Sequence, residues 1–346
     1  GTISTTISIT VVDAISDNSF DPVADQTVTA TTTDNDVAGF TVAQTGGSTS
    51  VAETGTTDTF TVVLNAQPTS DVVLTMSSGD TGEATVTSLL TFTNANWNAP
   101  QTVTVTGIDD SIDDGDQNST VTITVNDGST ADNNFDPLAD SQITVTTTDD
   151  DTSGFTLSSS TATVSEAGTT GTFTVVLDSQ PSGNVVIDLS ASDTGEATVD
   201  KSTLTFTAGD WDSPQTVTVT GVDDNLDDGD QSSTVTLAVN AGSTADNSYD
   251  ALANQTVSVT TVDDDGPGFT ISSTTATVSE AGTTATITVV LDSQPTSDVV
   301  ISVTSPDTGE VTVGSAQVTF TNANWNTPQD VIVTGVDETT VDGDQT

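Results

Sequence analysis

The sequence predicts an all-β protein made of tandem Greek-key antiparallel β-sandwiches in a linear array. Three observations lead to this prediction: β-branched residues alternate along short runs, turn residues recur between the runs, and the same residues return about every 114 positions. Apolar residues make up 32% of the 346-residue chain, a low share for a globular protein. They are mainly valines that alternate with threonines, however, and this pattern suits a pleated, half-buried surface.

The second repeat shows the expected strands most clearly. Between residues 216 and 220 the valines fall on one face and the threonines on the other, so we expect one face to pack and the other to meet water. Turn sequences such as Gln180-Pro181-Ser182-Gly183 and Ala241-Gly242-Ser243 separate the runs. Several short strands with such turns are typical of a Greek-key sandwich. The expected strands are 161–165, 172–177, 185–189, 203–207, 216–222, 234–239 and 256–262.

The repeat length defines the expected domains. Trp97, Trp211 and Trp325 are spaced by 114 residues, which is about one β-sandwich domain. The two end fragments together amount to one further repeat. We favour a window cut from a longer tandem array; the alternative is strand donation, in which neighbouring copies complete each other head to tail. The expected domains are 1–36 (C-terminal part of a repeat), 37–152 and 153–265 (complete repeats), and 266–346 (N-terminal part of a repeat).

The charge of the chain excludes several functions. The sequence has 51 acidic residues against the single basic residue Lys201, with no histidine and no cysteine, and its formal net charge is −50. Nucleic acids and anionic membranes require a basic surface, and no apolar run approaches the roughly 20 residues of a membrane-spanning helix. A catalytic site would have to use carboxylates alone. We therefore predict that the protein is not an enzyme, because a carboxylate-pair glycosidase needs a cleft and nothing marks one.

The acids gather in two loops of each repeat. One loop begins at Asp109, Asp223 or Asp337, and the other is an acidic triplet just before the Gly-Phe pair that opens the next repeat. Carboxylates that converge without a basic partner indicate a site for a hard cation. Calcium takes six to eight oxygens in flexible geometry, so we rank it first and magnesium second.

These motifs resemble the Calx-β domain family. The residues that carry the resemblance are Thr163-Val164-Ser165-Glu166, Phe206 to Asp210, Val217 to Asp224, and Val259 to Asp265 followed by Gly268-Phe269. The resemblance implies an immunoglobulin-like sandwich that binds calcium at one end. One departure is that the family's Glu-rich stretch after the Asp pair is here Asp-Asp-Gly-Asp, one residue shorter. The implied metal ligands, with their equivalents in the partial repeats, are Asp34, Asp36, Glu53, Asp109, Asp110, Asp113, Asp149, Asp150, Asp151, Glu166, Asp223, Asp224, Asp227, Asp263, Asp264, Asp265, Glu280 and Asp337.

Other recurring residues have simpler interpretations. We expect each tryptophan to be a packing anchor rather than a sugar-stacking platform. Asp80, Asp193 and Asp307 are expected to form turns rather than to bind metal.

The sequence therefore predicts an extracellular structural protein, a calcium-stiffened stalk or filament of a secreted bacterial adhesin or surface fibre, whose partners are calcium ions and neighbouring repeats. One alternative is a filament subunit completed head to tail by strand donation. The other is a calcium-dependent module that binds carbohydrate or protein.

Overall fold

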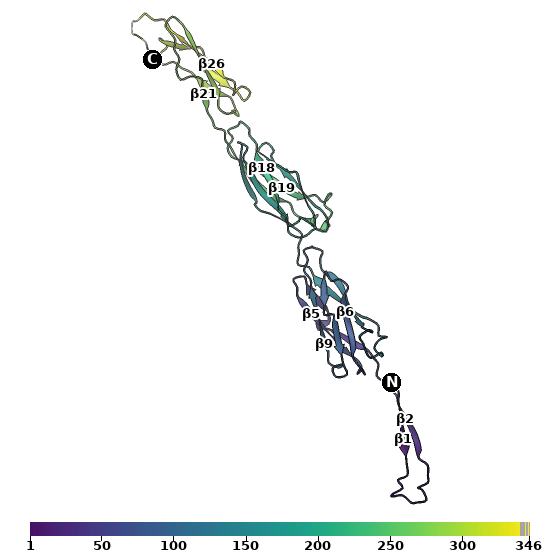
Figure 1. Ribbon diagram of the computed structural model, residues 1–346. Coiled ribbons are helices and arrows are strands. Elements are labelled where there is room, and N and C mark those ends of the chain that lie inside the picture. Colours follow the sequence, from purple (N-terminus) through teal and green to yellow (C-terminus); the bar gives the residue numbers. More distant parts are fainter. Residues whose placement is uncertain (340–342, 344, 346) are drawn as a thin grey trace. The chain divides into compact units, whose positions relative to one another are not determined.

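A computed structural model describes residues 1–339, 343 and 345 (Figure 1). The chain divides into two compact units, Gly1–Asp150 and Asp151–Thr346. Strands dominate the described residues, and the helices there are two single 3₁₀ turns, η1 (Thr45–Gly47) and η2 (Asn247–Tyr249). Among these residues no helix is long and apolar enough to cross a membrane. The end of the expected unit 266–346, namely residues 340–342, 344 and 346, lies outside the described residues.

The first unit contains a hairpin and a complete sandwich. The hairpin pairs β1 (Ile3–Ile9) with β2 (Gln26–Thr32) in antiparallel register. The sandwich has a four-stranded sheet in the order β3-β5-β9-β7 and a five-stranded sheet in the order β4-β11-β10-β6-β8. Its strands are β3 (Phe40–Gln44), β4 (Thr49–Ala52), β5 (Thr57–Leu64), β6 (Val72–Ser78), β7 (Ala84–Val86), β8 (Leu89–Phe92), β9 (Gln101–Gly107), β10 (Gln117–Val125) and β11 (Ser141–Thr148).

The second unit begins with a sandwich of the same topology. Its sheets have the orders β12-β14-β18-β16 and β13-β20-β19-β15-β17, so strand for strand they match those of the first sandwich. The strands are β12 (Phe155–Leu157), β13 (Thr161–Ser165), β14 (Thr170–Leu177), β15 (Val185–Ala191), β16 (Ala197–Val199), β17 (Thr203–Phe206), β18 (Gln215–Gly221), β19 (Gln231–Val239) and β20 (Gln255–Val262).

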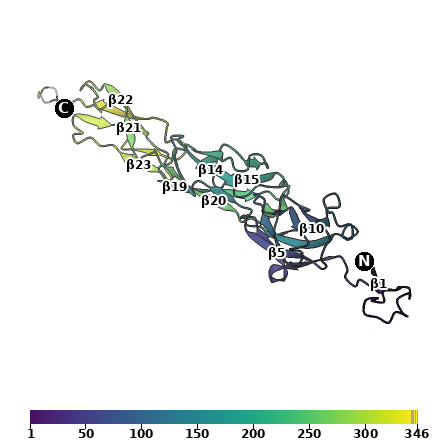
Figure 2. The ribbon, with the colours of Figure 1, turned by 60° about the horizontal axis from the view of Figure 1, so that its bottom comes forward.

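The rest of the second unit is a partial sandwich, yellow-green in Figure 2. One sheet has the full order β21-β22-β26-β24, but the other contains only the pair β23-β25 within the described residues. The strands are β21 (Phe269–Ile271), β22 (Thr284–Leu291), β23 (Val299–Ser302), β24 (Val311–Val313), β25 (Gln317–Phe320) and β26 (Gln329–Gly335).

The prediction of tandem β-sandwiches is confirmed, and the seven strands expected in the second repeat are all present. Two short strands, β12 and β16, were not predicted because three residues are too few to show an alternating pattern. One pair in each complete sandwich also differs from the antiparallel expectation, namely β4 with β11 and β13 with β20. The chain crosses from the four-stranded to the five-stranded sheet between Leu157 and Thr161, and β13 then pairs with β20 in parallel.

Each sandwich encloses its own valine-rich core. In β18, Val217 and Val219 are fully buried between the sheets, as the alternation predicts, while the neighbouring threonines are half-buried or exposed. Trp211 packs against the edge of this core, and Trp97 and Trp325 occupy the same place in the other two sandwiches. The tryptophans are therefore packing anchors, as expected.

A buried aspartate joins two loops at one end of each complete sandwich. In the second sandwich, Asp246 accepts hydrogen bonds from the backbone N–H and hydroxyl of Ser182 (2.7 and 2.9 Å) and from those of Ser248 (3.0 and 2.7 Å). Burial by itself would raise the pKa of Asp246, but these bonds outweigh burial and lower it. Asp132 makes the equivalent bonds with Thr69 and Asn134. This carboxylate link fastens the turn before β15 to the loop between β19 and β20.

We expect Asp246→Ala to destabilise the second sandwich by about 2 to 4 kcal/mol, because it removes a charged acceptor and leaves buried donors without partners. Scanning calorimetry of the whole chain measures this loss. Asp212→Ala is the matched control, since it removes the same charge from an exposed position. Equal stability of the two variants would contradict the role assigned to Asp246.

Candidate metal centre

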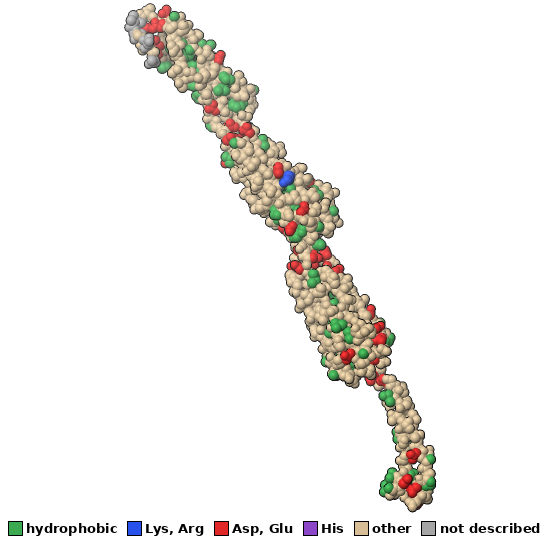
Figure 3. All heavy atoms as spheres, in the orientation of Figure 1, with side chains coloured by type: hydrophobic (Ala, Val, Ile, Leu, Met, Phe, Trp, Pro, Cys, Tyr) green, Lys and Arg blue, Asp and Glu red, His purple; other side chains and the backbone are tan. Residues whose placement is uncertain are grey.

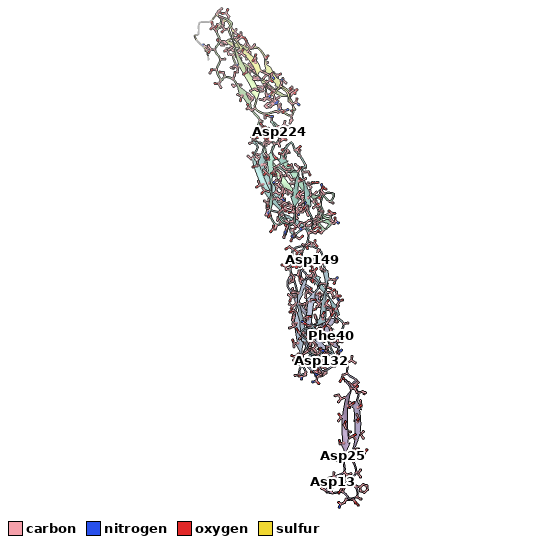
Figure 4. All side chains as sticks on the ribbon, turned by 45° about the vertical axis from the view of Figure 1, so that its right-hand side comes forward. Asp13, Asp25, Phe40, Asp132, Asp149 and Asp224 are labelled. Atoms are coloured by element: carbon pink, nitrogen blue, oxygen red, sulfur yellow. The ribbon has the colours of Figure 1, made fainter. Side chains whose placement is uncertain are left out.

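Four segments of the second sandwich meet at the end opposite the Asp246 link. Glu166 follows β13, Glu196 precedes β16, Asp224 follows β18 and Asp265 follows β20. The parallel pairing of β13 with β20 brings the carboxyl ends of both strands to this end of the sheet. Figure 4 shows the same arrangement in the first sandwich, where Asp149 and Asp132 lie at opposite ends.

Backbone contacts fix these segments to one another. The N–H of Glu166 donates to the Val262 carbonyl oxygen (3.1 Å), and the N–H of Val222 donates to the Glu196 carbonyl oxygen (2.9 Å). Gly221 allows the closest approach, because a Cβ atom at this position would overlap the carbonyl oxygen of Ser165. Gly107 and Gly335 meet Ala52 and Ser279 in the same way. Glycine here lets the strand that leads to Glu166 lie directly against the strand that leads to Asp224.

The acidic loops are folded locally by their own carboxylates. Asp224 Oδ1 accepts a hydrogen bond from the Leu226 N–H (2.7 Å), and Asp263 Oδ2 accepts one from the Gly229 N–H (2.7 Å). Asp263 Oδ1 also accepts one from the Asp265 N–H (2.9 Å). Gly229 has a φ of 74°, a left-handed conformation that favours glycine. The loop after β18 is thus tied to the triplet after β20.

These segments bring three carboxylates together. Ligand oxygens of Glu166, Asp224 and Asp265 lie within 4.8 Å of one another. Glu166 is only 1% exposed, and its Oε2 atom is buried without a hydrogen-bond partner among the described residues. The first sandwich has a related cluster of Glu53, Glu83 and Asp110, in which Glu83 takes the place of an aspartate from the terminal triplet. Glu53 is also 1% exposed, and its Oε2 atom has no partner among the described residues. A buried carboxylate oxygen without a partner is costly, and here it occurs at the same place in both complete sandwiches.

The electrostatics of both clusters favour protonated glutamates in the absence of a cation. Burial, followed by the charges of Asp224 and Asp263, raises the pKa of Glu166 to about 7. Burial and the charges of Asp110 and Asp149 likewise raise the pKa of Glu53 to about 7. The pKa values of Glu83, Glu196 and Asp265 are raised as well, in each case mainly by burial. Each cluster therefore concentrates more carboxylate charge than the protein balances with positive groups of its own.

The chain supplies almost no positive charge to offset these clusters. The ammonium of Lys201, the one basic side chain, lies 3.7 Å from Asp200 and donates a hydrogen bond to the Thr216 carbonyl oxygen. In Figure 3 acidic side chains, in red, far outnumber basic ones, in blue. The potential ligands in each cluster are carboxylate oxygens, which suit a hard divalent cation. Because most of these ligands lie in loops, their geometry suits calcium better than magnesium. These residues fit a calcium ion.

Some of the predicted ligands lie together in the carboxylate clusters, and others lie outside them. Glu53, Asp110, Glu166, Asp224 and Asp265 lie in the clusters, and Asp149 and Asp263 lie near enough to raise the glutamate pKa values. Asp264 contributes its backbone N–H, which hydrogen-bonds to the Glu166 carboxylate. The exposed predicted residues are Asp34, Asp36, Asp109, Asp150, Asp223, Asp227, Asp264, Glu280 and Asp337, whereas Asp113 is half-buried, as is Asp151, the first residue of the second unit. Their roles as ligands stay predictions.

Sequence reasoning did not include Glu83 and Glu196 among the candidate ligands. Each has a buried Oε2 atom without a partner in the part of the chain that the structure describes, and Glu83 lies within the first cluster. The sequence does contain a pattern that could have identified them, because the chain has only seven glutamates and these two occupy equivalent positions after a turn. Asp193 forms that turn by accepting a hydrogen bond from the Gly195 N–H (2.9 Å), which confirms its expected role, and Asp80 and Asp307 do the same.

The sequence matches the model of one known domain family. The family model of the Calx-beta domain matches residues 33–151, 148–265 and 262–344. The chain belongs to the Calx-beta domain family. None of the curated proteins matches it.

Several solved structures are similar to this chain at low sequence identity. The calcium binding domain CBD12 of CALX1.1 is 15% identical, covers 57% of this chain and 80% of its own, and has a TM-score of 0.27. CBD12 from CALX1.2 is 12% identical, covers 63% and 99% of the two chains, and has a TM-score of 0.26. Domains 1–6 of the surface layer protein SbsC are 14% identical, cover 86% and 38%, and have a TM-score of 0.28.

We expect Gly221→Ala to destabilise the second sandwich by about 1 to 3 kcal/mol, because the added methyl group must push Ser165 away and Glu166 with it. Scanning calorimetry and calcium titration of the whole chain measure the loss of stability and of affinity. Gly209→Ala is the matched control, since its Cβ would meet only the Thr207 hydroxyl at 3.9 Å. A Gly221→Ala protein with unchanged calcium affinity would contradict this positioning role.

In metal-free buffer we expect stability to fall as the pH rises from about 4.5 to about 7, because folded Glu166 and Glu53 hold protons that the unfolded chain releases. Melting temperatures measured across this pH range test the sign. The double variant Glu53→Gln/Glu166→Gln should show a smaller fall, since both groups no longer titrate. The same slope in the variant and in the parent would refute the assignment.

Proposed function

We propose that this protein is an extracellular structural protein in which calcium, bound at one end of each sandwich, stabilises and stiffens a stalk or filament. The observation that carries the proposal is the buried Glu166 Oε2 atom, which has no partner among the described residues and lies among the carboxylates of Asp224 and Asp265. A cation placed between these oxygens would supply the missing partner. The repetition of the same site in the first sandwich suits a structural array, in which each repeat adds length.

Uncompensated negative charge destabilises the site when no ion is bound. Carboxylates that share a buried site repel one another and lose hydration, and with Lys201 engaged elsewhere the chain provides no nearby counter-charge. An ion that binds only the folded state stabilises it by RT ln(1 + [L]/Kd), so stability rises with the free ion concentration. Calcium binding is therefore expected to act on folding, and we propose no catalytic step at this site.

The ion-site loop also contacts the sandwich that follows it in the second unit. The Asn225 carbonyl oxygen accepts a hydrogen bond from the Gln294 N–H (2.7 Å), and Leu226 forms an isolated β-bridge with Gln294. Because Asp224 belongs to the same loop, a bound ion would order the segment that carries this contact. This connection supports stiffening across the junction as well as stabilisation within one sandwich.

The proposed location is the bacterial cell surface or the extracellular medium, as part of an adhesin or surface fibre. The supporting features are the large excess of acidic residues in the sequence and sites suited to an ion that is abundant outside cells. An acidic chain of this kind stays soluble through charge repulsion.

We expect calcium to raise the melting temperature of the whole chain by about 10 °C when its free concentration is about 100 times the Kd. Calorimetry with calcium, with magnesium and with a chelator measures the effect, and magnesium should give the smaller rise. Glu53→Gln/Glu166→Gln should lose most of the calcium effect. Asp71→Asn/Asp212→Asn, which removes two exposed charges from the same sandwiches, should keep it. An unchanged melting temperature of the parent protein would exclude the proposed function.

A further inference from the structure

The two edge strands of the five-stranded sheet in the second sandwich, β13 and β17, lack the usual protection of a sheet edge. They lie at the two ends of the sheet order, so no strand among the described residues pairs with their outer sides. An open edge is a template for pairing with another chain, and proteins commonly protect it with lysine, other charged side chains or proline. Both strands consist only of Thr, Ala, Val, Ser, Leu and Phe, so any protection must come from elsewhere.

The strand pairing shows which backbone groups of β17 face the open side. The Leu189 N–H, on β15, donates to the Ser202 carbonyl oxygen (2.8 Å). Along an antiparallel pair, residues that bond to the partner strand alternate with residues that face away from it. Thr203, Thr205 and Thr207 therefore direct their backbone N–H and carbonyl groups to the open side.

Two side chains occupy these outward-facing groups. The Thr207 N–H donates to Asp210 Oδ1 (2.6 Å), and the Asp210 N–H donates to the Thr207 carbonyl oxygen (3.2 Å). Gln215, the first residue of β18 in the other sheet, donates from Nε2 to the Thr205 carbonyl oxygen (2.7 Å). Asp210 thus exchanges two hydrogen bonds with Thr207 as a residue of a neighbouring strand would. We call Asp210 and Gln215 together the edge cap of β17.

The same edge cap recurs in the other two sandwiches. Asn96 and Asn324 stand in place of Asp210, and the Oδ1 atom of each accepts a threonine N–H at 2.5 and 2.6 Å. The glutamine of the cap is also repeated, with Nε2-to-carbonyl distances of 2.8 Å for Gln101 with Thr91 and 2.7 Å for Gln329 with Thr319. Aspartate and asparagine share the accepting oxygen but not the charge. The common feature of the three caps is therefore the hydrogen bond and not the charge.

The opposite edge of the sheet is capped by hydroxyl groups. Because the Glu166 N–H bonds to β20, alternation along β13 makes Thr161 and Ser165 face the open side. The Ser165 N–H donates to the Thr169 hydroxyl (2.7 Å). Ser159 Oγ accepts a hydrogen bond from the Thr161 N–H (3.2 Å) and donates one to the Thr161 carbonyl oxygen (2.7 Å). Both open edges of this sheet are thus bonded to side chains of their own sandwich.

We propose that these caps prevent the sandwiches of different copies of this chain from pairing edge to edge. Without its cap, β17 of one copy would meet β17 of a second copy across a two-fold axis, and their outward-facing backbone groups would form an antiparallel pair. The caps occupy groups that such a pair needs. The net charge of −50 also keeps copies apart, but salt screens that repulsion and leaves the caps in place. This role does not depend on calcium binding.

Sedimentation of the whole chain at high salt tests the proposal, because a Debye length of about 3 Å at 1 M salt removes most of the charge repulsion. The parent should stay at its monomer mass of 35.0 kDa. Asp210→Ala/Gln215→Ala should shift toward twice this mass over the concentration range in which the parent stays monomeric. The reason is that the freed groups of Thr205 and Thr207 can then pair with a second copy.

Two matched controls separate the cap from other effects of these substitutions. Asp210→Asn removes the same charge but keeps the oxygen that accepts the Thr207 N–H, so it should stay monomeric. Gln142→Ala removes an exposed glutamine from β11, an inner strand of its sheet, and should also stay monomeric. Association of Asp210→Asn equal to that of the double variant would overturn the proposal, because loss of charge alone would then be the cause.

Hydrogen exchange locates the contact and shows that the associating protein is folded. In the double variant, amides of residues 203–207 should exchange more slowly as the concentration rises, while the amides of the central strand β19 stay protected at every concentration. If the double variant does not fold, Gln215→Ala, which leaves the Asp210 turn intact, is measured in the same way. A folded variant that stays monomeric, or one that associates without slower exchange at residues 203–207, would overturn the proposal.

Discussion

The constraint on which this structure depends is a glutamate buried beside two aspartates in a chain with one basic side chain. Glu166 and Glu53 are as buried as core valines, yet each retains a carboxylate oxygen for which the described residues supply no partner. The strands that deliver these groups are held by tight backbone contacts at Gly221 and Gly107, so the carboxylates cannot simply move apart. The fold therefore holds these carboxylates together without a positive group of its own beside them, an arrangement that suits a bound cation.

The architecture could be predicted because it depends on local patterns that repeat. The alternation of Val217 and Val219 with threonines predicts both the strand and its buried face, and the 114-residue spacing of the tryptophans predicts the sandwiches. What escaped prediction depends on pairing between distant strands. β12 and β16 are three residues long, and the parallel pairing of β13 with β20 follows from a change of sheet that leaves no signature in the local sequence.

The candidate site was only partly predictable for a related reason. Asp224 and Asp265 belong to acidic loops that stand out in the sequence, whereas Glu83 follows a turn and reaches the first cluster only through the Greek-key arrangement. In both complete sandwiches the buried glutamate follows a short strand that pairs in parallel with the last strand of the five-stranded sheet.

A crystal structure of the whole chain grown with calcium is the most direct test of the central claim. The account predicts an ion in each complete sandwich, about 2.3 to 2.6 Å from a carboxylate oxygen of Glu166 or Glu53 and within bonding distance of the adjacent aspartates. Anomalous scattering would identify the ion as calcium. Well-ordered density that shows these glutamates hydrogen-bonded to water alone, at calcium concentrations of millimolar order, would contradict the account.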